Sequence, residues 1–387
     1  MIARTIQQRL LSLWRSYPVV AVTGPRQSGK TTLSRATFPD FGYVNLESPD
    51  VRQMAETDAR AFLKTFPPPL IIDEAQRVPN LLSYIQVAVD ADGQNGRYLL
   101  TGSHQPRLNA EVAQSLAGRV GLLRLLPLSL IELGAAGIVM ERDEYLFKGF
   151  MPRGYANDIE PSTLYSDYFS TYIERDVRQI INLKNINTFE VFIKLLAGRT
   201  GQLVNLSSLS NDVGVTSGTI SEWLSVLEAS FIIFRLPCYF ENFGKRLIKS
   251  QKLYFTEVGL ATWLLGIRDV TQVTRDPLFG GLFENMVVVE ALKARLNAGL
   301  SPELYFLRDS AGLEVDLLFC KSRDCLIPIE IKGGMTWNKE FAAGIGKIRK
   351  LSPKFKSGFV VYGGELTPEM ELVKFLNFKD TAQAVTD

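Results

Sequence analysis

The sequence predicts a multidomain α/β protein, and three observations lead to that prediction. Strand-like and helix-like patterns alternate over residues 1–135, as expected for a doubly wound parallel sheet. Helical patterns dominate residues 162–270, and a helix followed by three strand-like runs occupies residues 271–372. We expect glycine and proline residues to make a linker of residues 136–161, and residues 373–387 to form a tail.

A glycine-rich segment follows the first apolar strand, Val19–Val22, and matches the pattern G-x-x-x-x-G-K-[ST]. Its backbone N–H groups and the helix that follows can cradle phosphates. Lys30 would neutralise the β- and γ-phosphates, and the Thr31 hydroxyl would hold Mg²⁺. The sequence therefore predicts a phosphate loop (P-loop) for ATP and Mg²⁺, made by Gly24, Pro25, Arg26, Gln27, Ser28, Gly29, Lys30, Thr31 and Thr32.

A second apolar run, Leu70–Ile72, ends in two carboxylates, Asp73 and Glu74. Ligands bind at the carboxyl ends of the strands in open parallel sheets. We expect Asp73 to hold the Mg²⁺ shell and Glu74 to polarise a water toward the γ-phosphate. The alternative is that both carboxylates belong to a solvated turn.

A third strand, 98–100, is followed by Thr101 and Ser103, either of which could bind the attacking water or the γ-phosphate. The pattern does not choose between them. Arg119 could stabilise charge on the γ-phosphate, in its own chain or from a neighbouring subunit. The alternative is a surface arginine.

Composition excludes several classes of protein. The chain has 387 residues, 46% hydrophobic, with a net charge of +2, so nucleic-acid binding would need local basic patches. The three cysteines have no C-x-x-C spacing, which argues against a disulfide framework or a zinc site. Charged residues and a proline interrupt the apolar stretch 120–140, so we expect no membrane span and a cytoplasmic location.

Residues 206–227 read as two short helices joined by a turn at Gly214, a helix-turn-helix pattern. The strand-like runs 231–236 and 252–255, with the basic stretch 242–249 between them, suggest the wing of a winged helix. Such a module binds DNA in many proteins, but packing or protein contact is the alternative here.

The last domain carries a third set of candidate residues. Glu284 lies on a predicted helix and Asp316 on one predicted strand, while Glu330 and Lys332 lie two residues apart on the next. Strand alternation places Glu330 and Lys332 on the same face. Two carboxylates around Mg²⁺ or Mn²⁺, with a lysine to orient a water, can cleave a phosphodiester. A plain ion pair between Glu330 and Lys332 is the alternative.

With these three groups of residues, the chain resembles a family of bacterial and archaeal AAA-type ATPases that carry a C-terminal domain of unknown function. The resemblance covers nearly the whole chain and is carried by residues 24–33, 72–76, 100–103, 116–119, 126–129, 172–176, 196–198, 281–285 and 329–332. It implies a C-terminal fold similar to PD-(D/E)xK restriction endonucleases. Asp316, Glu330 and Lys332 would then take the motif positions, with Glu284 as the helix carboxylate. The chain lacks the proline that precedes the first of these in the family pattern.

Together these observations predict a Mg²⁺-dependent ATPase whose nucleotide state controls nucleic-acid binding or cleavage by the C-terminal domains. The alternative is an ATP-dependent regulatory switch without nuclease activity. The expected partners are ATP, DNA, and a second copy of the chain or another protein, with a second divalent cation at the C-terminal site.

Overall fold

The computed structural model describes residues 1–102, 115–172, 186–239, 251–308, 312–370 and 372–386. The chain forms two compact units. The first contains Met1–Leu128 together with Ala229–Phe231 and Leu296–Leu300. The second contains the remainder, beginning at Ser129.

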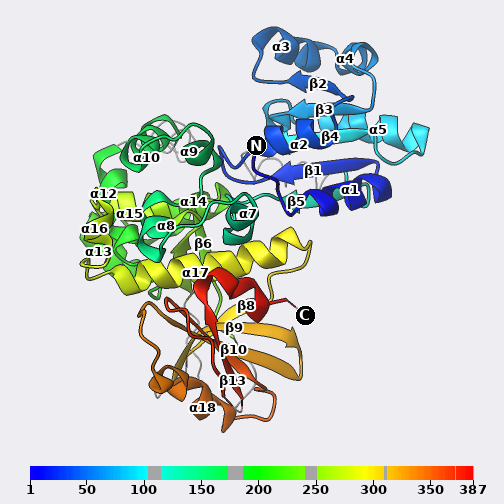
Figure 1. The fold of residues 1–387 in the computed structure, drawn as a ribbon. Coiled ribbons are helices and arrows are strands. Elements are labelled where there is room, and N and C mark those ends of the chain that lie inside the picture. The colour runs from blue at the N-terminus through cyan, green and yellow to red at the C-terminus, as the bar shows by residue number, and fades with distance from the viewer. Residues whose placement is uncertain (103–114, 173–185, 240–250, 309–311, 371, 387) are drawn as a thin grey trace. The chain divides into compact units, whose positions relative to one another are not determined.

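The first unit is a five-stranded parallel sheet with the strand order β2-β3-β4-β1-β5. Helices cover both of its faces, as the alternating sequence pattern predicts (Figure 1). Its elements in chain order are α1 (Gln7–Ser16), β1 (Val19–Thr23), α2 (Lys30–Thr37), β2 (Gly42–Asn45), α3 (Pro49–Thr57), α4 (Ala59–Thr65), β3 (Leu70–Asp73), the 3₁₀ turn η1 (Ala75–Arg77), α5 (Leu81–Asp92), β4 (Tyr98–Gly102) and β5 (Val120–Arg124).

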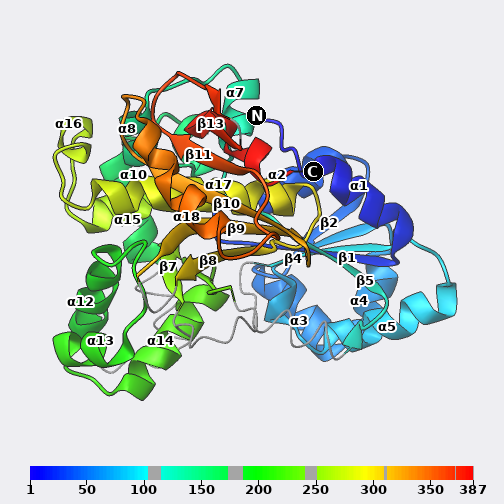
Figure 2. The same ribbon diagram turned by 90° about the horizontal axis from the view of Figure 1, so that it is seen from below.

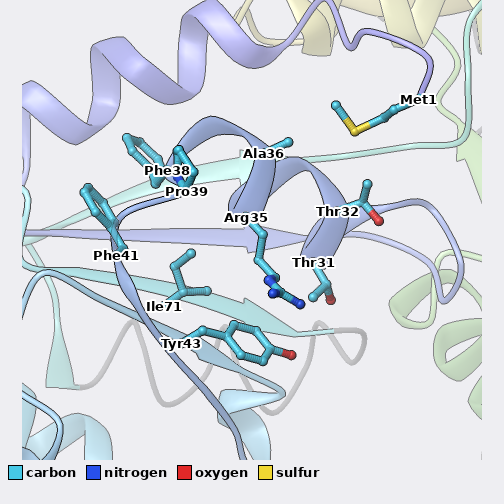
Figure 3. A pocket seen from close by; sticks show the side chains of 10 residues that line it. All are labelled: Met1, Thr31, Thr32, Arg35, Ala36, Phe38, Pro39, Phe41, Tyr43 and Ile71. Atoms are coloured by element: carbon cyan, nitrogen blue, oxygen red, sulfur yellow. The ribbon is translucent and has the colours of Figure 1, made fainter.

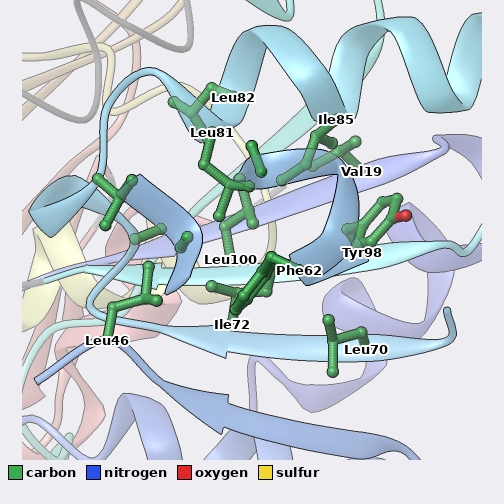
Figure 4. Packing of buried hydrophobic residues seen from close by; sticks show 14 of the residues in the cluster. Val19, Leu46, Phe62, Leu70, Ile72, Leu81, Leu82, Ile85, Tyr98 and Leu100 are labelled. Carbon is green, nitrogen blue, oxygen red and sulfur yellow. The ribbon is translucent and has the colours of Figure 1, made fainter. Parts of the chain in front are cut away.

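Side chains that alternate along each strand build the two faces of this sheet. Val20 and Val22 of β1 pack with α1 and α2 on one face. Val19 and Ala21 pack with α3, α4 and α5 on the other, where Phe62 lies at the centre of the cluster (Figure 4). Burial on both faces explains why the central strands read as continuous apolar runs. Because these strands pair in parallel, the carboxyl ends of β1, β3 and β4 lie at one edge of the sheet.

The second unit begins with helices that lead to a two-stranded antiparallel sheet, β6 with β7. These elements are α7 (Leu130–Ala135), α8 (Arg142–Lys148), α9 (Pro152–Ala156), α10 (Pro161–Tyr168), α12 (Ile186–Ala197), α13 (Leu206–Val213), α14 (Ser217–Ala229), β6 (Ile233–Leu236), β7 (Lys252–Phe255), α15 (Val258–Leu264) and α16 (Val270–Val273).

Residues 136–161, expected to be a linker, contain two helices of this unit. Glu141 and Glu144 form a reciprocal capping box at the start of α8, and Pro152 occupies the first turn of α9. Both are start signals for helices. The prediction weighed the glycines and prolines as breakers, although here they separate short helices.

The unit ends in a six-stranded mixed sheet with the order β12-β13-β11-β10-β9-β8. Figures 1 and 2 show α17 beside this sheet, and Figure 1 shows α18 on its other side. The elements are α17 (Phe279–Asn297), β8 (Leu304–Arg308), β9 (Glu314–Ser322), β10 (Cys325–Lys332), the 3₁₀ turn η3 (Lys339–Ala342), α18 (Ala343–Arg349), β11 (Gly358–Tyr362), β12 (Glu369–Met370), β13 (Val373–Asn377) and the 3₁₀ turn η4 (Phe378–Ala384).

The expected tail at residues 373–387 is wrong, because its first residues form β13. This strand pairs in parallel with β11, from Gly358↔Val373 to Tyr362↔Asn377. Phe375 and Leu376 of β13 are buried. Residues 373–377 therefore belong to the core of the six-stranded sheet.

Candidate functional site

The candidate residues of the first unit meet at the carboxyl edge of its sheet. The glycine-rich segment Gly24–Thr32 joins the end of β1 to α2, Asp73 ends β3, and Thr101 lies near the end of β4. Thr101 is next to Val22 of β1 in the parallel register. The topology therefore brings together residues that are nearly 80 positions apart in the chain.

Two glycines shape the phosphate loop. Gly24 has φ +152°, and a Cβ there would lie 2.0 Å from the carbonyl oxygen of Leu125. Gly29 has φ +91° and takes the left-handed conformation just before α2 begins. A residue with a Cβ is strained in such conformations, so both positions need glycine.

Arg4, which the sequence did not single out, lies outside the phosphate loop in the chain and donates hydrogen bonds to it. Its Nη1 donates to the carbonyl oxygen of Ser28 at 2.7 Å, and its Nη2 donates to that of Leu126 at 2.6 Å. The guanidinium thus joins the loop to the chain that follows β5. A single arginine near a chain end carries no sequence signal of its own, so only the fold reveals this role.

Lys30 is buried, with 6% of its surface exposed, and its Nζ donates to the carbonyl oxygens of Gly24 at 3.0 Å and Pro25 at 2.7 Å. Burial lowers the pKa of Lys30 to about 8, although the charges of Glu74 and Asp73 oppose the change. A lysine that is costly to keep charged is stabilised by a nearby anion such as a phosphate.

Asp73 accepts three side-chain hydrogen bonds. Its Oδ2 accepts from the Thr31 hydroxyl at 2.9 Å and from the Tyr43 hydroxyl at 2.9 Å. Its Oδ1 accepts from the buried Thr101 hydroxyl. Both carboxylate oxygens are therefore held in fixed directions beside the phosphate loop. The sequence predicted Thr31 and Thr101 as candidates, but it gave no sign of Tyr43.

Glu74 follows β3 in an unusual backbone conformation, with φ 55° and ψ 44°. Its Oε2 accepts a hydrogen bond from Nε2 of Gln76. Left-handed conformations of residues other than glycine cost energy and occur often at functional sites. The turn directs the chain away from the sheet edge immediately after Asp73.

The loop residues fit a bound nucleotide on two counts. Ser28 Oγ and Gln27 Oε1 are buried and have no hydrogen-bond partner among the described residues. The first N–H groups of α2 also have no acceptor within their own helix. A nucleotide's phosphates would accept hydrogen bonds from the Ser28 hydroxyl and from these N–H groups, whereas Gln27 Oε1 is itself an acceptor.

A hollow of about 490 Å³ lies beside this edge, along α2 (Figure 3). Thr31, Arg35 and Tyr43 line it on the side of Asp73. The remaining lining residues are Met1, Thr32, Ala36, Phe38, Pro39, Phe41 and Ile71. The hollow is therefore polar at the phosphate loop and apolar farther along the helix.

Two other predicted residues are not part of this described site. Ser103 falls outside the described residues. Arg119 precedes β5, and its carbonyl oxygen accepts from Val19 N at the start of β1. It therefore lies at the amino edge of the sheet, about 16 Å from the phosphate loop across five residues of strand. Its guanidinium donates to Asp90 Oδ2 at 2.8 Å. Of the two roles that the sequence left open, this position argues against one in its own chain's site, and a role in trans stays a prediction.

In the second unit, Asp316 and Glu330 share one lysine. Lys332 Nζ lies 3.1 Å from Asp316 Oδ2 and 2.7 Å from Glu330 Oε2. Ile331 N also donates to Asp316 Oδ2 at 2.8 Å. The two carboxylates therefore point to the same side of adjacent antiparallel strands, β9 and β10.

Electrostatics in this group depend on burial. Glu330 is 6% exposed, and burial, with the charge of Asp316, raises its pKa to about 7. Burial alone would lower the pKa of Lys332, but the charges of Asp316 and Glu330 outweigh it and raise that pKa. The lysine thus stays protonated and compensates the two carboxylates.

Glu284 is held by two residues that sequence reasoning did not select. Its Oε1 accepts from Lys252 Nζ at 3.0 Å and from the Tyr254 hydroxyl at 2.6 Å, both on β7. Lys252 also lies 2.7 Å from Glu314 Oε1. Burial raises the pKa of Glu284, against the opposing charge of Lys252. The charge of Glu284 is therefore compensated by Lys252, as the charges of Asp316 and Glu330 are by Lys332.

No group of three or more His, Cys, Asp or Glu side chains that could hold a metal ion occurs in the described part of the chain. The arrangement of Asp316, Glu330 and Glu284 therefore does not fit the expected second divalent cation. Instead, Lys332 pairs with both Asp316 and Glu330, and Lys252 pairs with Glu284.

The middle region contains the two helices and the strand pair that the sequence predicted. Gly214, with φ +76°, ends α13, and Thr216 Oγ1 accepts from Thr219 N to cap α14. β6 and β7 pair in antiparallel fashion after these helices. The basic stretch 242–249 lies outside the described residues.

Models of three protein families match the chain in succession. The first, an AAA domain, matches residues 16–134. Two domains of unknown function follow, DUF8612 at residues 140–271 and DUF4143 at residues 279–380.

Curated relatives cover most of the chain. The uncharacterized proteins Rv2008c of Mycobacterium tuberculosis and Mb2031c of Mycobacterium bovis are each 33% identical over 320 residues, which is 81% of this chain and 70% of each relative. An uncharacterized protein of Haemophilus influenzae is 25% identical, over 74% of this chain and 77% of that protein.

Among solved structures, the Walker-type ATPase PABY2304 of Pyrococcus abyssi matches 68% of this chain and 96% of its own, with 14% identity and a TM-score of 0.44. DnaA of Aquifex aeolicus matches 58% of this chain and 85% of its own, with 13% identity and a TM-score of 0.28. Within the described residues of the present chain, no helix has the length and apolar character needed to cross a bilayer.

Proposed function

The chain belongs to the same family as the mycobacterial proteins Rv2008c and Mb2031c, and we propose that its AAA domain hydrolyses ATP with Mg²⁺. The observation that carries this proposal is the hydrogen bond from Thr31 of the phosphate loop to Asp73 at the end of β3. P-loop NTPases hold Mg²⁺ with these two residue types.

The loop residues would bind the triphosphate. The glycines at positions 24 and 29 allow the backbone turns of the loop, backbone N–H groups of the loop and of the start of α2 would bind the phosphates, and Lys30 supplies the positive charge. Because Lys30 is buried, its ammonium gains more from a phosphate than an exposed lysine would. Its present acceptors are carbonyl oxygens of the loop itself, which a phosphate would replace.

Asp73 and Thr31 would hold Mg²⁺, which when bound supplies charge neutralisation at the β- and γ-phosphates. Thr101 keeps Asp73 in place through its buried hydroxyl. Glu74, held by Gln76, would accept the proton of the attacking water. The left-handed turn at Glu74 supports this role, since it sets the direction of the carboxylate relative to β3.

The test is steady-state hydrolysis with the variants Lys30→Ala and Glu74→Gln. Lys30→Ala should abolish both ATP binding and turnover. Glu74→Gln should bind ATP like the wild type and lose turnover by about a hundredfold or more, because its amide cannot accept a proton. Normal turnover by Glu74→Gln would contradict the assignment of Glu74. The absence of ATP hydrolysis in the wild type would contradict the proposal itself.

A second candidate function lies in the C-terminal domain, and the shared lysine of Asp316 and Glu330 favours it. We propose that this domain, with a fold similar to PD-(D/E)xK endonucleases, binds nucleic acid under control of the nucleotide state. The helices α13 and α14 with the β6–β7 pair would act as the winged helix. Cleavage would require Lys252 to release Glu284, and the alternative is a switch without nuclease activity.

This second proposal is tested by incubating the protein with plasmid and linear DNA, with and without ATP, in Mg²⁺ or Mn²⁺. Loss of DNA binding in the variant Lys332→Ala would support it. The matched control is Lys339→Ala, which changes an exposed lysine on the same domain. Equal DNA binding by wild type and Lys332→Ala would argue for the switch.

A further inference from the structure

Tyr43 reaches the candidate magnesium site from the edge strand of the first sheet. It lies on β2, whose neighbour β3 carries Asp73 at its end. The Tyr43 hydroxyl donates to Asp73 Oδ2 at 2.9 Å. Figure 3 shows its ring directed toward the same side of α2 as Thr31 and Arg35.

The three side-chain hydrogen bonds that Asp73 accepts come from two parts of the first unit, the phosphate loop and the neighbouring strands. Thr31 belongs to the phosphate loop, and its oxygen would ligate Mg²⁺ in the proposed function. Tyr43 and Thr101 come from the neighbouring strands β2 and β4, and each fixes one oxygen of the carboxylate. Without the Tyr43 hydroxyl, Thr31 would be the one side chain among those described that donates to Oδ2.

The tyrosine itself is held in place and stays a donor. The guanidinium carbon of Arg35 lies 4.8 Å from the centre of its ring, a cation–π contact. A phenol is protonated at neutral pH and a carboxylate can only accept, so the Tyr43 hydroxyl is the donor in its hydrogen bond with Asp73.

We infer that Tyr43 is a positioning residue of the proposed ATPase, whose hydroxyl orients the Asp73 carboxylate for Mg²⁺ bound with ATP. This inference rests on the proposed function. Because the hydroxyl contacts Asp73, the inferred role of Tyr43 concerns the binding of the cation rather than the binding of the phosphates. Groups that orient metal ligands in this way typically change metal affinity by about 10–100-fold when they are removed.

The variant Tyr43→Phe separates this role from packing, since it removes the hydroxyl and keeps the ring under Arg35. Binding of a fluorescent ATP analogue is measured first in EDTA and then over a series of Mg²⁺ concentrations. We expect equal affinity in EDTA. The Mg²⁺ concentration that gives half of the affinity gain should rise about tenfold in the variant.

Hydrolysis provides the second readout. At low Mg²⁺ the variant should lose most of its turnover, and at saturating Mg²⁺ it should recover toward the wild-type rate. The matched control is Tyr84→Phe, which removes a hydroxyl from an exposed tyrosine on α5 and should change neither measurement.

Two outcomes would overturn the inference. A Mg²⁺ dependence identical to that of the wild type would show that the hydroxyl does not orient Asp73. A loss of affinity in EDTA would assign Tyr43 to the loop or to packing instead. Failure of the proposed function is distinguishable, because it appears in the wild type as Mg²⁺-dependent binding without hydrolysis. The binding assay then still tests Tyr43.

Discussion

Replacing Glu330 by glutamine should make the second unit more stable at neutral and alkaline pH. Glu330 is buried between Lys332, at 2.7 Å from its Oε2, and Gly344 of α18, whose added Cβ would lie 2.1 Å from its Oε1. Burial and the charge of Asp316 raise its pKa from 4.5 to about 7. Its ionised form is therefore unfavourable in the folded protein.

The sign of the effect follows from proton binding. Between about pH 4.5 and 7 the folded protein keeps a proton on Glu330 that the unfolded chain has lost, so stability falls as the pH rises. The difference between the two pKa values corresponds to about 3 kcal/mol, reached fully above the folded pKa. Glutamine has no charge to lose, and its carbonyl oxygen can still accept from Lys332.

Urea unfolding in EDTA, at about pH 4.5 and at about pH 8, measures this difference. The free energy of unfolding of Glu330→Gln relative to wild type should increase by about 3 kcal/mol between these two conditions. Hydrogen exchange of the β10 amides gives the same quantity locally. The control is Glu369→Gln on β12, an exposed position where the difference should not depend on pH. A difference for Glu330→Gln that is equal at both pH values would refute the reasoning.

Three further substitutions follow from the contacts described. Gly24→Ala should abolish ATP binding and destabilise the first unit by about 1–3 kcal/mol or more, because the added Cβ would meet the Leu125 carbonyl oxygen. Nucleotide titration measures the first effect, and urea unfolding measures the second. Arg119→Ala should leave hydrolysis per protomer unchanged in dilute protein, where contact between copies is lost, because Arg119 lies at the opposite edge of its own sheet. Lys293→Met should destabilise the second unit by about 3–5 kcal/mol in urea unfolding, because it leaves the buried Glu290 without the ammonium that lies 2.7 Å away.

Each of these has a control and a contradicting result. Gly134→Ala, where an added Cβ meets no atom within 4 Å, should leave ATP binding unchanged. Wild-type ATP affinity in Gly24→Ala would contradict the steric argument. Reduced hydrolysis by dilute Arg119→Ala would contradict the geometry of the first sheet. Adding Glu290→Gln to Lys293→Met should restore part of the lost stability, and no recovery would show that the buried charge is not the cause.

The sequence predicted those residues of the first site that belong to a short sequence motif. Lys30 and Thr31 follow from the glycine pattern, and Asp73 follows from an apolar strand that ends in carboxylates. Tyr43 could not be found in this way. Its contact with Asp73 depends on β2 lying beside β3, and strand order in a sheet is not encoded in a local pattern.

The same limit applies in the second unit. Strand alternation predicted that Glu330 and Lys332 share a face, but the contact of Lys332 with Asp316 depends on the antiparallel register of β9 and β10. β13 lies in the expected tail, and its strand character depends on its partner strand rather than on a local pattern. Its pairing with β11, more than ten residues earlier, is what buries Phe375.

Lys252 shows why the expected border between residues 270 and 271 does not separate two independent parts. It lies on β7 of the middle region and is 3% exposed, yet it pairs with Glu284 of α17 and Glu314 of β9. Separating the middle region from the C-terminal sheet would leave these charges without their partners, at a cost of several kcal/mol. The helices and the sheet therefore belong to one compact unit.

The border between the two units falls within the segment Leu125–Leu130, between Leu128 and Ser129. At its start, Leu125 N donates to the carbonyl oxygen of Thr23 at 2.8 Å, and its own carbonyl oxygen faces Gly24 of the phosphate loop. At its end, Leu130 N donates to Glu290 Oε2 of α17 at 2.8 Å. Variants that separate ATP hydrolysis from the function proposed for the C-terminal domain should therefore lie at positions such as Tyr43 and Lys332, whose described contacts stay within one unit.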